Sequence, residues 1–112
     1  MAVYVNNIVI NTNEDFTQTF TLQSAADKTA LNLTDYTVSS QMRKHAGSST
    51  ATNFDANVVS PATSGKVSIA LTSTDTANLK EGRYVYDIVI EKDSSKTKVV
   101  EGMVIVNKGV TR

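Results

Sequence analysis

Side chains able to take part in catalysis are few in this chain, and none has a chemical partner in the sequence. The single histidine, His45, lies in the polar stretch RKHAGSST. A loop histidine without a partner is typical of a solvated residue rather than a general base. The absence of cysteine excludes thiol chemistry, and no serine stands in a G-x-S-x-G turn after a strand. We therefore expect no catalytic residue and no enzymatic activity.

One loop is rich in oxygen-bearing side chains, because Asn11, Asn13 and Asp15 alternate and Glu14 stands beside them. Calcium takes about six to eight oxygen ligands, usually including several carboxylates. This loop lacks the glycine and the distal glutamate of an EF-hand, so we expect an ordinary turn in which Asn and Asp bond their own backbone. The glycines stand singly, and no glycine-rich loop is present to bind phosphate. No metal and no cofactor are expected.

Asp87 is an unusual acid because it lies in the middle of an apolar strand, between Tyr86 and Ile88. A carboxylate in that position either faces a wet patch or pairs with a cation on a neighbouring strand, such as Lys98 or Arg43. We favour a structural pairing that fixes the strand register over a functional role.

The overall charge and composition exclude several classes of function. The chain has 11 basic and 11 acidic residues and no Lys/Arg cluster, so we expect no binding to nucleic acid. No apolar run approaches the ~20 residues of a membrane span. The first residues lack the features of a signal peptide, and together with the absent cysteines this favours folding in a cytosol. A net charge of zero suits a protein that ends in an assembly.

Apolar residues recur at every second position along most of the chain, which is typical of half-buried strands. In the segment FTQTFTL, for example, Phe16, Phe20 and Leu22 share one face while threonines occupy the other. The pattern and its turn signals predict strands over residues 3–10, 16–23, 36–43, 53–59, 66–71, 83–91 and 97–106.

About seven short strands at this spacing predict an all-β fold, an antiparallel two-sheet β-sandwich with Ig-like topology. We expect one domain over residues 1–112, and a small β-barrel is the alternative architecture. A short helical turn is predicted near 72–79, capped by Ser73 or Thr74, with Gly82 ending the connection in a left-handed conformation. In the segment LKEGRYVYDIVI, Tyr84 or Tyr86 fits a tyrosine corner, in which the hydroxyl bonds an upstream backbone group.

The strand predicted over 83–91 is apolar on both faces, since Val85 and Val89 oppose the tyrosines and isoleucines of the other face. The strand predicted over 97–106 repeats this, with Met103 opposing Val104. Gly102 is expected to form a bulge that shifts the phase of this strand. The second apolar face needs cover, either by the first strand of the chain or by another subunit, and the sequence leaves both explanations open.

The longest irregular segment runs over residues 43–53 and is polar and rich in small residues. It is either a solvated hairpin loop or a contact loop presented by a rigid sandwich. As a contact loop, its candidate residues are Arg43, Lys44, His45, Ser48 and Ser49.

The order of these features resembles a class of small β-sandwich virion proteins of tailed bacteriophages, and it is similar to the amino-terminal domain of phage baseplate upper proteins. The likeness covers nearly the whole chain. Its most specific residues are Leu31, Leu33, Thr34 and Tyr36, then Gly82, Tyr84, Tyr86 and Asp87, then Glu101, Gly102 and the closing Val110, Thr111 and Arg112.

The resemblance implies a non-enzymatic structural protein of the virion, folded in the host cytoplasm and then assembled in many copies with other virion proteins of the capsid, neck, tail or baseplate. In baseplate proteins this domain leads into a longer receptor-binding or shaft region, whereas this chain ends within six residues of its last predicted strand. The expectation is therefore a subunit that decorates, cements or joins other particle proteins. The alternative is an adhesion or glycan-binding module that contacts the host surface, against which the lack of tryptophan counts.

Overall fold

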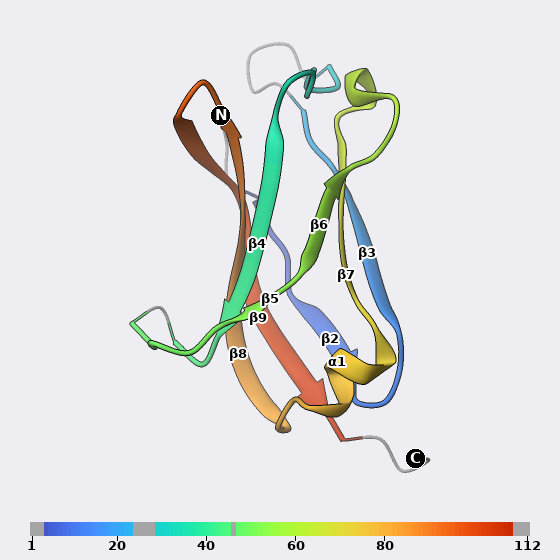
Figure 1. Ribbon diagram of the computed structural model, residues 1–112, viewed down its shortest axis with the longest axis vertical. Coiled ribbons are helices and arrows are strands. Elements are labelled where there is room, and N and C mark those ends of the chain that lie inside the picture. The colour runs from blue at the N-terminus through green and yellow to red at the C-terminus, as the bar shows by residue number, and fades with distance from the viewer. Residues whose placement is uncertain (1–3, 24–28, 46, 109–112) are drawn as a thin grey trace.

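In a computed structural model, the chain forms an all-β sandwich of two packed sheets, which confirms the fold class expected from the sequence (Figure 1). The structure describes residues 4–23, 29–45 and 47–108, without the side chain of Tyr4. The closing Val110, Thr111 and Arg112 lie outside these residues. Among the described residues, no helix has the length and apolar character needed to cross a membrane.

The larger sheet is built around a long hairpin of β8 (Gly82–Lys92) and β9 (Ser95–Asn107). The two residues between them, Asp93 and Ser94, both have positive φ, which is the geometry that matches the right-handed twist of a two-residue hairpin. On the other side of β8 lies β4 (Thr37–Arg43), which is antiparallel to β8 and carries the two-residue strand β5 (Thr52–Asn53) at its end.

The first strand of the chain joins this sheet in a way that the sequence did not predict. It is split into β1 (Tyr4–Val5) and β2 (Ile8–Asn11), and both parts pair parallel with β9 at the edge of the sheet. The rest of the sandwich is antiparallel, as expected. Parallel pairing is possible here because β1 and β9 are separated by nearly the whole chain, which provides the crossover connection.

The smaller sheet has the order β3–β7–β6 and consists of β3 (Phe16–Thr21), β7 (Lys66–Leu71) and β6 (Asp55–Val58). Together with the order β9–β8–β4 in the larger sheet, this is the arrangement of strands B, E, D and C, F, G in an Ig-like sandwich. A 3-10 turn, η1 (Ala62–Ser64), precedes β7.

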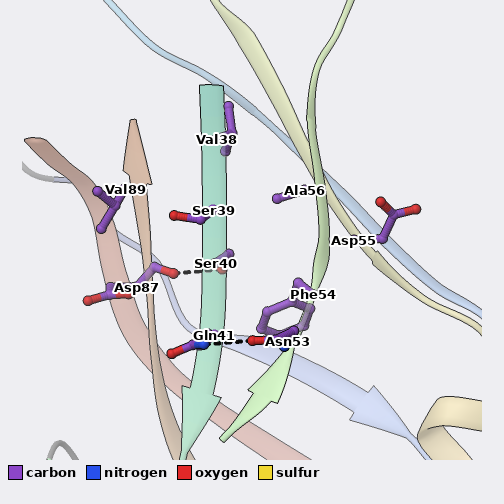
Figure 2. A pocket seen from close by; sticks show the side chains of 10 residues that line it. All are labelled: Val38, Ser39, Ser40, Gln41, Asn53, Phe54, Asp55, Ala56, Asp87 and Val89. Atoms are coloured by element: carbon purple, nitrogen blue, oxygen red, sulfur yellow. Dashed lines mark hydrogen bonds between the residues drawn. The ribbon is translucent and has the colours of Figure 1, made fainter. Parts of the chain in front are cut away.

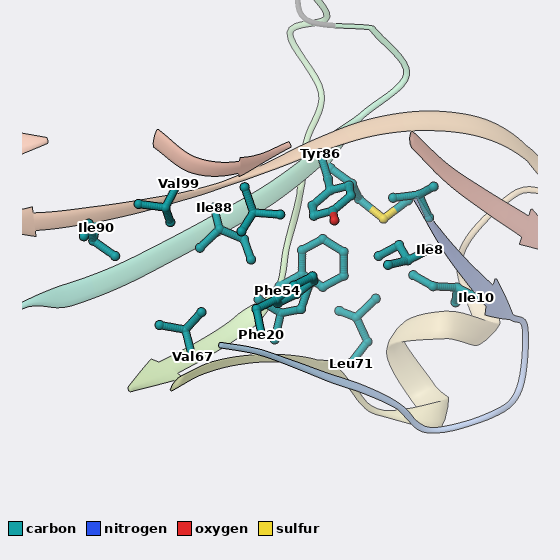
Figure 3. Close-up of a cluster of buried hydrophobic side chains, with 14 of the residues drawn as sticks. Ile8, Ile10, Phe20, Phe54, Val67, Leu71, Tyr86, Ile88, Ile90 and Val99 are labelled. Atoms are coloured by element: carbon teal, nitrogen blue, oxygen red, sulfur yellow. The ribbon is translucent and has the colours of Figure 1, made fainter. Parts of the chain in front are cut away.

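The core lies between the two sheets and follows the predicted alternation. In Figure 3, Tyr86 and Ile88 of the larger sheet point toward Phe20, Val67 and Leu71 of the smaller sheet. The Phe54 ring lies between the layers, with its centroid 6.0 Å from that of Phe16 and 6.3 Å from that of Tyr86. Aromatic side chains bury more area than other residues, so this cluster is a major part of the hydrophobic stabilisation.

The predicted helical turn is present as α1 (Ser73–Ala77), but its cap is Thr72 rather than Ser73 or Thr74. The Thr72 hydroxyl accepts a hydrogen bond from the Asp75 amide, and the Asp75 carboxylate accepts one from the Thr72 amide. This reciprocal capping box needs an acid three residues after the cap, and Thr72 is the residue that has one. Gly82 has φ of 140°, so the expected left-handed backbone is present in that connection.

Asp15 fixes the loop before β3 against α1. Its carboxylate accepts a hydrogen bond of 2.7 Å from the Ser73 amide, so it bonds a helix terminus rather than its own backbone. The fully buried hydroxyl of Thr76 donates to the Glu14 carbonyl at 2.9 Å from the same helix. The oxygen-rich loop therefore makes a structural contact with α1, because a carboxylate at a helix N-terminus is favourable.

The phase of β9 shifts, as expected, but the bulge is not at Gly102. The register passes from Ile88 opposite Val100 to Val89 opposite Lys98, which makes Val99 the extra residue. Val99 and Val100 are consecutive and both fully buried, which is possible only where the alternation is broken. Gly102 has a different role, because a Cβ at that position would overlap the Asn6 carbonyl oxygen.

Two tyrosines of β8 donate hydrogen bonds to backbone carbonyls outside the strand. The Tyr84 hydroxyl donates to the Lys80 carbonyl at 2.7 Å, which is the tyrosine corner expected for Tyr84 or Tyr86. The Tyr86 hydroxyl donates to the Asn6 carbonyl at 2.6 Å, and Tyr86 is 4% exposed. Tyr86 and Gly102 therefore contact the same carbonyl, at the link between β1 and β2, where the chain runs close beside β9.

Candidate contact surface on the outer face of the larger sheet

The outer face of the larger sheet carries apolar side chains that stay partly or largely exposed. They come from three neighbouring strands, since β1–β2, β9 and β8 are adjacent. The exposed fractions are 76% for Val5, 55% for Val9, 37% for Met103 and 36% for Val85. Strand alternation places these four on the face opposite the core, as predicted for Val85 and Met103.

The first strand does not cover this face. It lies beside β9 and lengthens the sheet, so Val5 and Val9 add to the apolar surface instead of burying it. Of the two explanations that the sequence left open, cover by the first strand is therefore not what the described residues show. Asn6 and Asn7 interrupt the strand, and the Asn7 side chain accepts a hydrogen bond of 3.0 Å from the Met103 amide.

A broad shallow hollow of about 850 Å³ lies on this face, above the middle of β8 and β9. Its apolar lining comes from Val5, Val85 and Met103. Its charged or ionisable lining comes from Arg43, His45, Asp87, Lys98 and Glu101. Apolar and charged side chains therefore lie together in this hollow, with Glu101 opposite both Val5 and Asp87 on the neighbouring strands.

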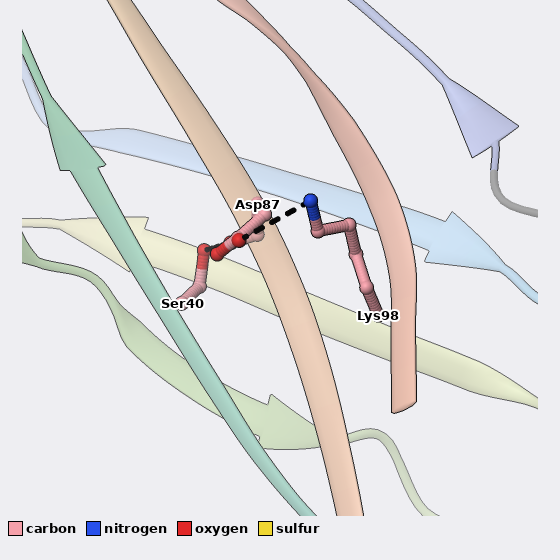
Figure 4. A network of polar contacts seen from close by, with 3 residues as sticks. All are labelled: Ser40, Asp87 and Lys98. Atoms are coloured by element: carbon pink, nitrogen blue, oxygen red, sulfur yellow. Dashed lines mark hydrogen bonds and ion pairs between the residues drawn. The ribbon is translucent and has the colours of Figure 1, made fainter. Parts of the chain in front are cut away.

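Asp87 pairs with Lys98, one of the two cations that the sequence suggested for it. Figure 4 shows the Lys98 ammonium directed toward the Asp87 carboxylate, at 4.0 Å. Both side chains are nearly half exposed, so this pair adds little to stability. The Asp87 backbone carbonyl accepts a hydrogen bond of 2.6 Å from the buried Ser40 hydroxyl, which joins β4 to β8 (Figure 4).

The predicted contact loop is only partly brought to the hollow, since Arg43 and His45 line it. Arg43 is held in place by hydrogen bonds of 2.6 Å to the Ser48 carbonyl and 2.9 Å to the Gln41 side chain. The Lys44 ammonium lies over the Tyr84 ring at 4.9 Å from its centroid, a cation–π contact away from the hollow.

The two serines of that loop are outside the hollow. The Ser48 hydroxyl is 3.3 Å from the Thr50 carbonyl, a contact within the loop itself. Ser49 is exposed. Both therefore fit the solvated hairpin that the sequence offered as the alternative.

A second hollow of about 480 Å³ lies where the chain passes from β5 to β6. In Figure 2, Phe54 and Ala56 are on the core side of β4, whereas Ser39 and Asp87 are on its outer side. The Gln41 amide donates to the Asn53 side chain at 2.6 Å across this hollow. Phe54 belongs to the core, so the hollow is a gap between the two sheet edges rather than a separate site.

Burial raises the pKa of the Tyr86 phenol to about 12. Among the described residues, no group of three or more His, Asp or Glu side chains is close enough to hold a metal ion. The features that stand out on this surface are therefore apolar area and flanking charge.

Sequence reasoning missed Val5, Val9 and Glu101 as members of this face. A signal for Val9 is present in the sequence, because IVI is a continuous apolar run like the one in YDIVI. The positions of Val5 and Glu101 depend on the parallel pairing of β1 with β9, which brings these two residues opposite each other.

Comparisons with known proteins show no family for this chain. No protein-family model matches the chain. No curated protein matches it by sequence. Among solved structures, it is similar to InlP of Listeria monocytogenes, with 13% identity and a TM-score of 0.49 over 91% of this chain. The chain spans 26% of the length of that protein.

Proposed function

We propose that this protein is a non-enzymatic structural protein of a tailed-phage virion, an assembly subunit that decorates, cements or joins other particle proteins. The observation that carries the proposal is the exposed apolar area on the outer face of the larger sheet. Four large apolar side chains on adjacent strands are between 36% and 76% exposed there. Three of them, Val5, Val85 and Met103, line one hollow, and an exposed apolar patch is typical of an interaction site.

The charges of the hollow favour a protein neighbour of balanced charge. Arg43 and Lys98 offset Asp87 and Glu101, so the lining of the hollow has no strong net sign. A partner with a matching apolar patch would bury Val85 and Met103 and meet both cations and anions in the same hollow, which gives specificity and register. The resemblance to phage virion proteins supports a neighbouring particle protein as that partner.

The alternative of a glycan-binding module has no specific observation in its favour. Sugar rings stack on exposed aromatic faces. The aromatic residues with described side chains are in the core or packed against it. The Lys92 ammonium lies over the Tyr36 ring, 5.6 Å from its centroid, and the Lys44 ammonium lies over the Tyr84 ring, 4.9 Å from its centroid. Tyr4, which the sequence singled out as a possible exception, has its side chain outside the described residues.

Mass spectrometry of purified particles that carry this gene tests the proposal. A decorating or joining subunit should be present in tens to hundreds of copies per particle, in a fixed ratio to the major capsid protein. Crosslinking before digestion should join lysines that flank the hollow, such as Lys98, to a peptide of another virion protein. Absence of the protein from purified particles would end the proposal.

A charge placed in the hollow tests which face makes the contact. Met103→Lys replaces an apolar side chain of the hollow by an ammonium, and burying a charge under a partner is costly. We expect the variant to fold with an unchanged melting temperature and to be missing from particles. Asn57→Lys is the matched control, because it adds the same charge to an exposed residue of β6, in the other sheet. Equal incorporation of both variants would place the contact elsewhere.

A further inference from the structure

One edge of the smaller sheet is open along its full length. In that sheet β3 pairs with β7 alone, and among the described residues no strand lies on its other side. In the Ig-like constant arrangement this place belongs to the first strand, which pairs with β9 in this protein. Because the first strand joins the larger sheet, the outer edge of β3 has no neighbouring strand among the described residues.

The backbone groups at this open edge can be assigned from the register. Leu22 donates to the Gly65 carbonyl at 2.7 Å, in line with the β3–β7 ladder. Because residues of an antiparallel strand alternate between facing the partner and facing away, Gln18 and Phe20 bond β7. The amides and carbonyls of Thr17, Thr19 and Thr21 then point outward, on a strand where these threonine side chains are exposed.

The β3 edge also lacks the features that usually protect an edge strand. Its sequence, FTQTFT, has no charge and no proline, and its register with β7 runs from Phe16 to Thr21 without a bulge. The other edges differ, since Asn6 and Asn7 interrupt the β1–β2 edge, β5 has two residues, and β6 has four residues and begins with the charged Asp55. An uncharged edge of this length without a bulge is a template for another strand.

The sequence of the strand reads the same in both directions around Gln18, as Phe-Thr-Gln-Thr-Phe. A two-fold symmetric contact requires that when residue i meets residue j, residue j also meets residue i. Antiparallel pairing centred on Gln18 meets this condition, with Phe16 opposite Phe20 and Thr17 opposite Thr19 of the second copy. Thr17 and Thr19 are then each opposite another threonine, so these threonine side chains of both copies lie on the same, solvent-facing side of the joined smaller sheets.

We propose that two copies of this chain associate through their β3 strands, antiparallel and centred on Gln18. The contact joins two three-stranded sheets into one continuous sheet. Thr17 and Thr19 of each copy exchange backbone hydrogen bonds with Thr19 and Thr17 of the other. No charges oppose each other on the strand, and the half-buried Phe16 gains cover from the second Phe20. This contact does not depend on the virion role, since it uses the other sheet.

Proline at position 19 tests the pairing without removing a bond of the monomer. The Thr19 amide faces away from β7, and proline is tolerated in an edge strand when its nitrogen faces solvent. Sedimentation of the wild type up to about 0.5 mM should show a reversible dimer. Thr19→Pro should raise the dimer dissociation constant at least about tenfold, through two lost hydrogen bonds and a clash with the second strand.

Ala56→Pro is the matched control, because Ala56 is on β6 at the opposite edge of the same sheet. The register with β7 and the bond from the Val59 amide to the Lys66 carbonyl show that the Ala56 amide also faces outward. This variant should dimerise like the wild type. A monomeric wild type at the highest concentration, or an equal loss of dimer in both variants, would overturn the proposal.

Disulfide trapping gives a second test that does not depend on how Thr19→Pro folds. The chain has no cysteine, so Gln18→Cys introduces a unique thiol. Centred pairing brings the two position-18 Cα atoms to about 4.5 Å, within the range of a disulfide. Gln18→Cys should form covalent dimers with oxidised glutathione at least about tenfold faster than Asn57→Cys on β6, since the paired thiols are held together. Equal rates would contradict the proposed register and edge.

Discussion

The two faces of the β8–β9 hairpin have similar amino acids and opposite environments. On the inner face, Tyr86 is 4% exposed and Ile88 and Val104 are fully buried. On the outer face, Val85 and Met103 are 36% and 37% exposed. Valine occurs on both faces, so the type of residue does not distinguish them. The difference is that the smaller sheet packs on one face, while β1 and β2 only extend the other.

The two faces should therefore contribute to different processes. Apolar area that is buried within the chain stabilises the fold at about 25 cal/mol per Å². Apolar area that stays in contact with water gives the fold almost nothing and becomes available to a partner. Substitutions on the inner face should change the free energy of unfolding, and those on the outer face should change association.

Tyr86→Ala should have the largest effect on stability. It leaves a cavity beside Phe54 and removes the hydrogen bond to the Asn6 carbonyl, at a cost of about 4 kcal/mol. Urea unfolding, monitored by circular dichroism, measures this loss. Tyr86→Phe keeps the ring and removes only the hydroxyl, so it should lower the free energy of unfolding by only about 1 kcal/mol. A melting temperature equal to that of the wild type would mean that this side of the hairpin is not a core face.

High pH should weaken the inner face through the same residue. Burial raises the pKa of Tyr86 to about 12 from its ordinary value of 10.0, so the unfolded chain releases the phenolic proton first. The contribution of the neutral phenol to the free energy of unfolding is fully present below pH 10 and is lost as pH rises through 12, a change of about 3 kcal/mol.

The stability difference between wild type and Tyr86→Phe isolates this effect, because all other titrating groups are shared. The difference should fall with a slope near 1.4 kcal/mol per pH unit between about pH 10 and 12. A difference that stays constant across this range would show that the phenol titrates equally in both states.

Gly102→Ala tests the close contact between β9 and the link from β1 to β2. The added methyl group overlaps the Asn6 carbonyl oxygen, so the first strand must move, at a cost of about 2 kcal/mol. Hydrogen exchange should become faster at the Asn6 amide, which bonds the Glu101 carbonyl. Gly47→Ala is the control, because its Cβ would make only ordinary contacts with His45, and its effect should stay within about 0.5 kcal/mol. Equal effects at both glycines would contradict the close approach.

The smallest effect is expected for one valine on the outer face. Val85→Ala should change the free energy of unfolding by less than about 0.5 kcal/mol. Val104→Ala, the same substitution on the inner face of the neighbouring strand, should cost about 2 kcal/mol. Chemical denaturation of the two variants side by side measures the contrast between the faces. Similar losses in both would show that the outer face is covered.

Much of the fold followed from local patterns. The apolar alternation located every long strand to within about two residues, and the tyrosine corner and the Asp87–Lys98 pair were among the expected contacts. The bulge was misplaced at Gly102 because a glycine inside a strand has two explanations, a bulge or a close backbone approach. Only the close approach of the Asn6 carbonyl to β9 distinguishes them.

The candidate surface was predictable in part. Val85 and Met103 were visible in the sequence as a second apolar side, and Arg43 and His45 were named as contact residues. Their meeting in one hollow was not predictable, because it depends on which strands are neighbours. Lys44, Ser48 and Ser49 adjoin these residues in the chain, yet they lie outside the hollow.

The sequence by itself determined the all-β class of the fold, because period-two apolar residues bury their side chains in sheets that pack face to face or close on themselves. It also determined that the last two strands carry more apolar surface than one face requires. Only the tertiary structure decided where the first strand goes. Its parallel pairing with β9 places Val5 and Val9 on an open face and leaves β3 without a neighbour. That choice depends on long-range contacts such as the one between Tyr86 and Asn6, which no local pattern encodes.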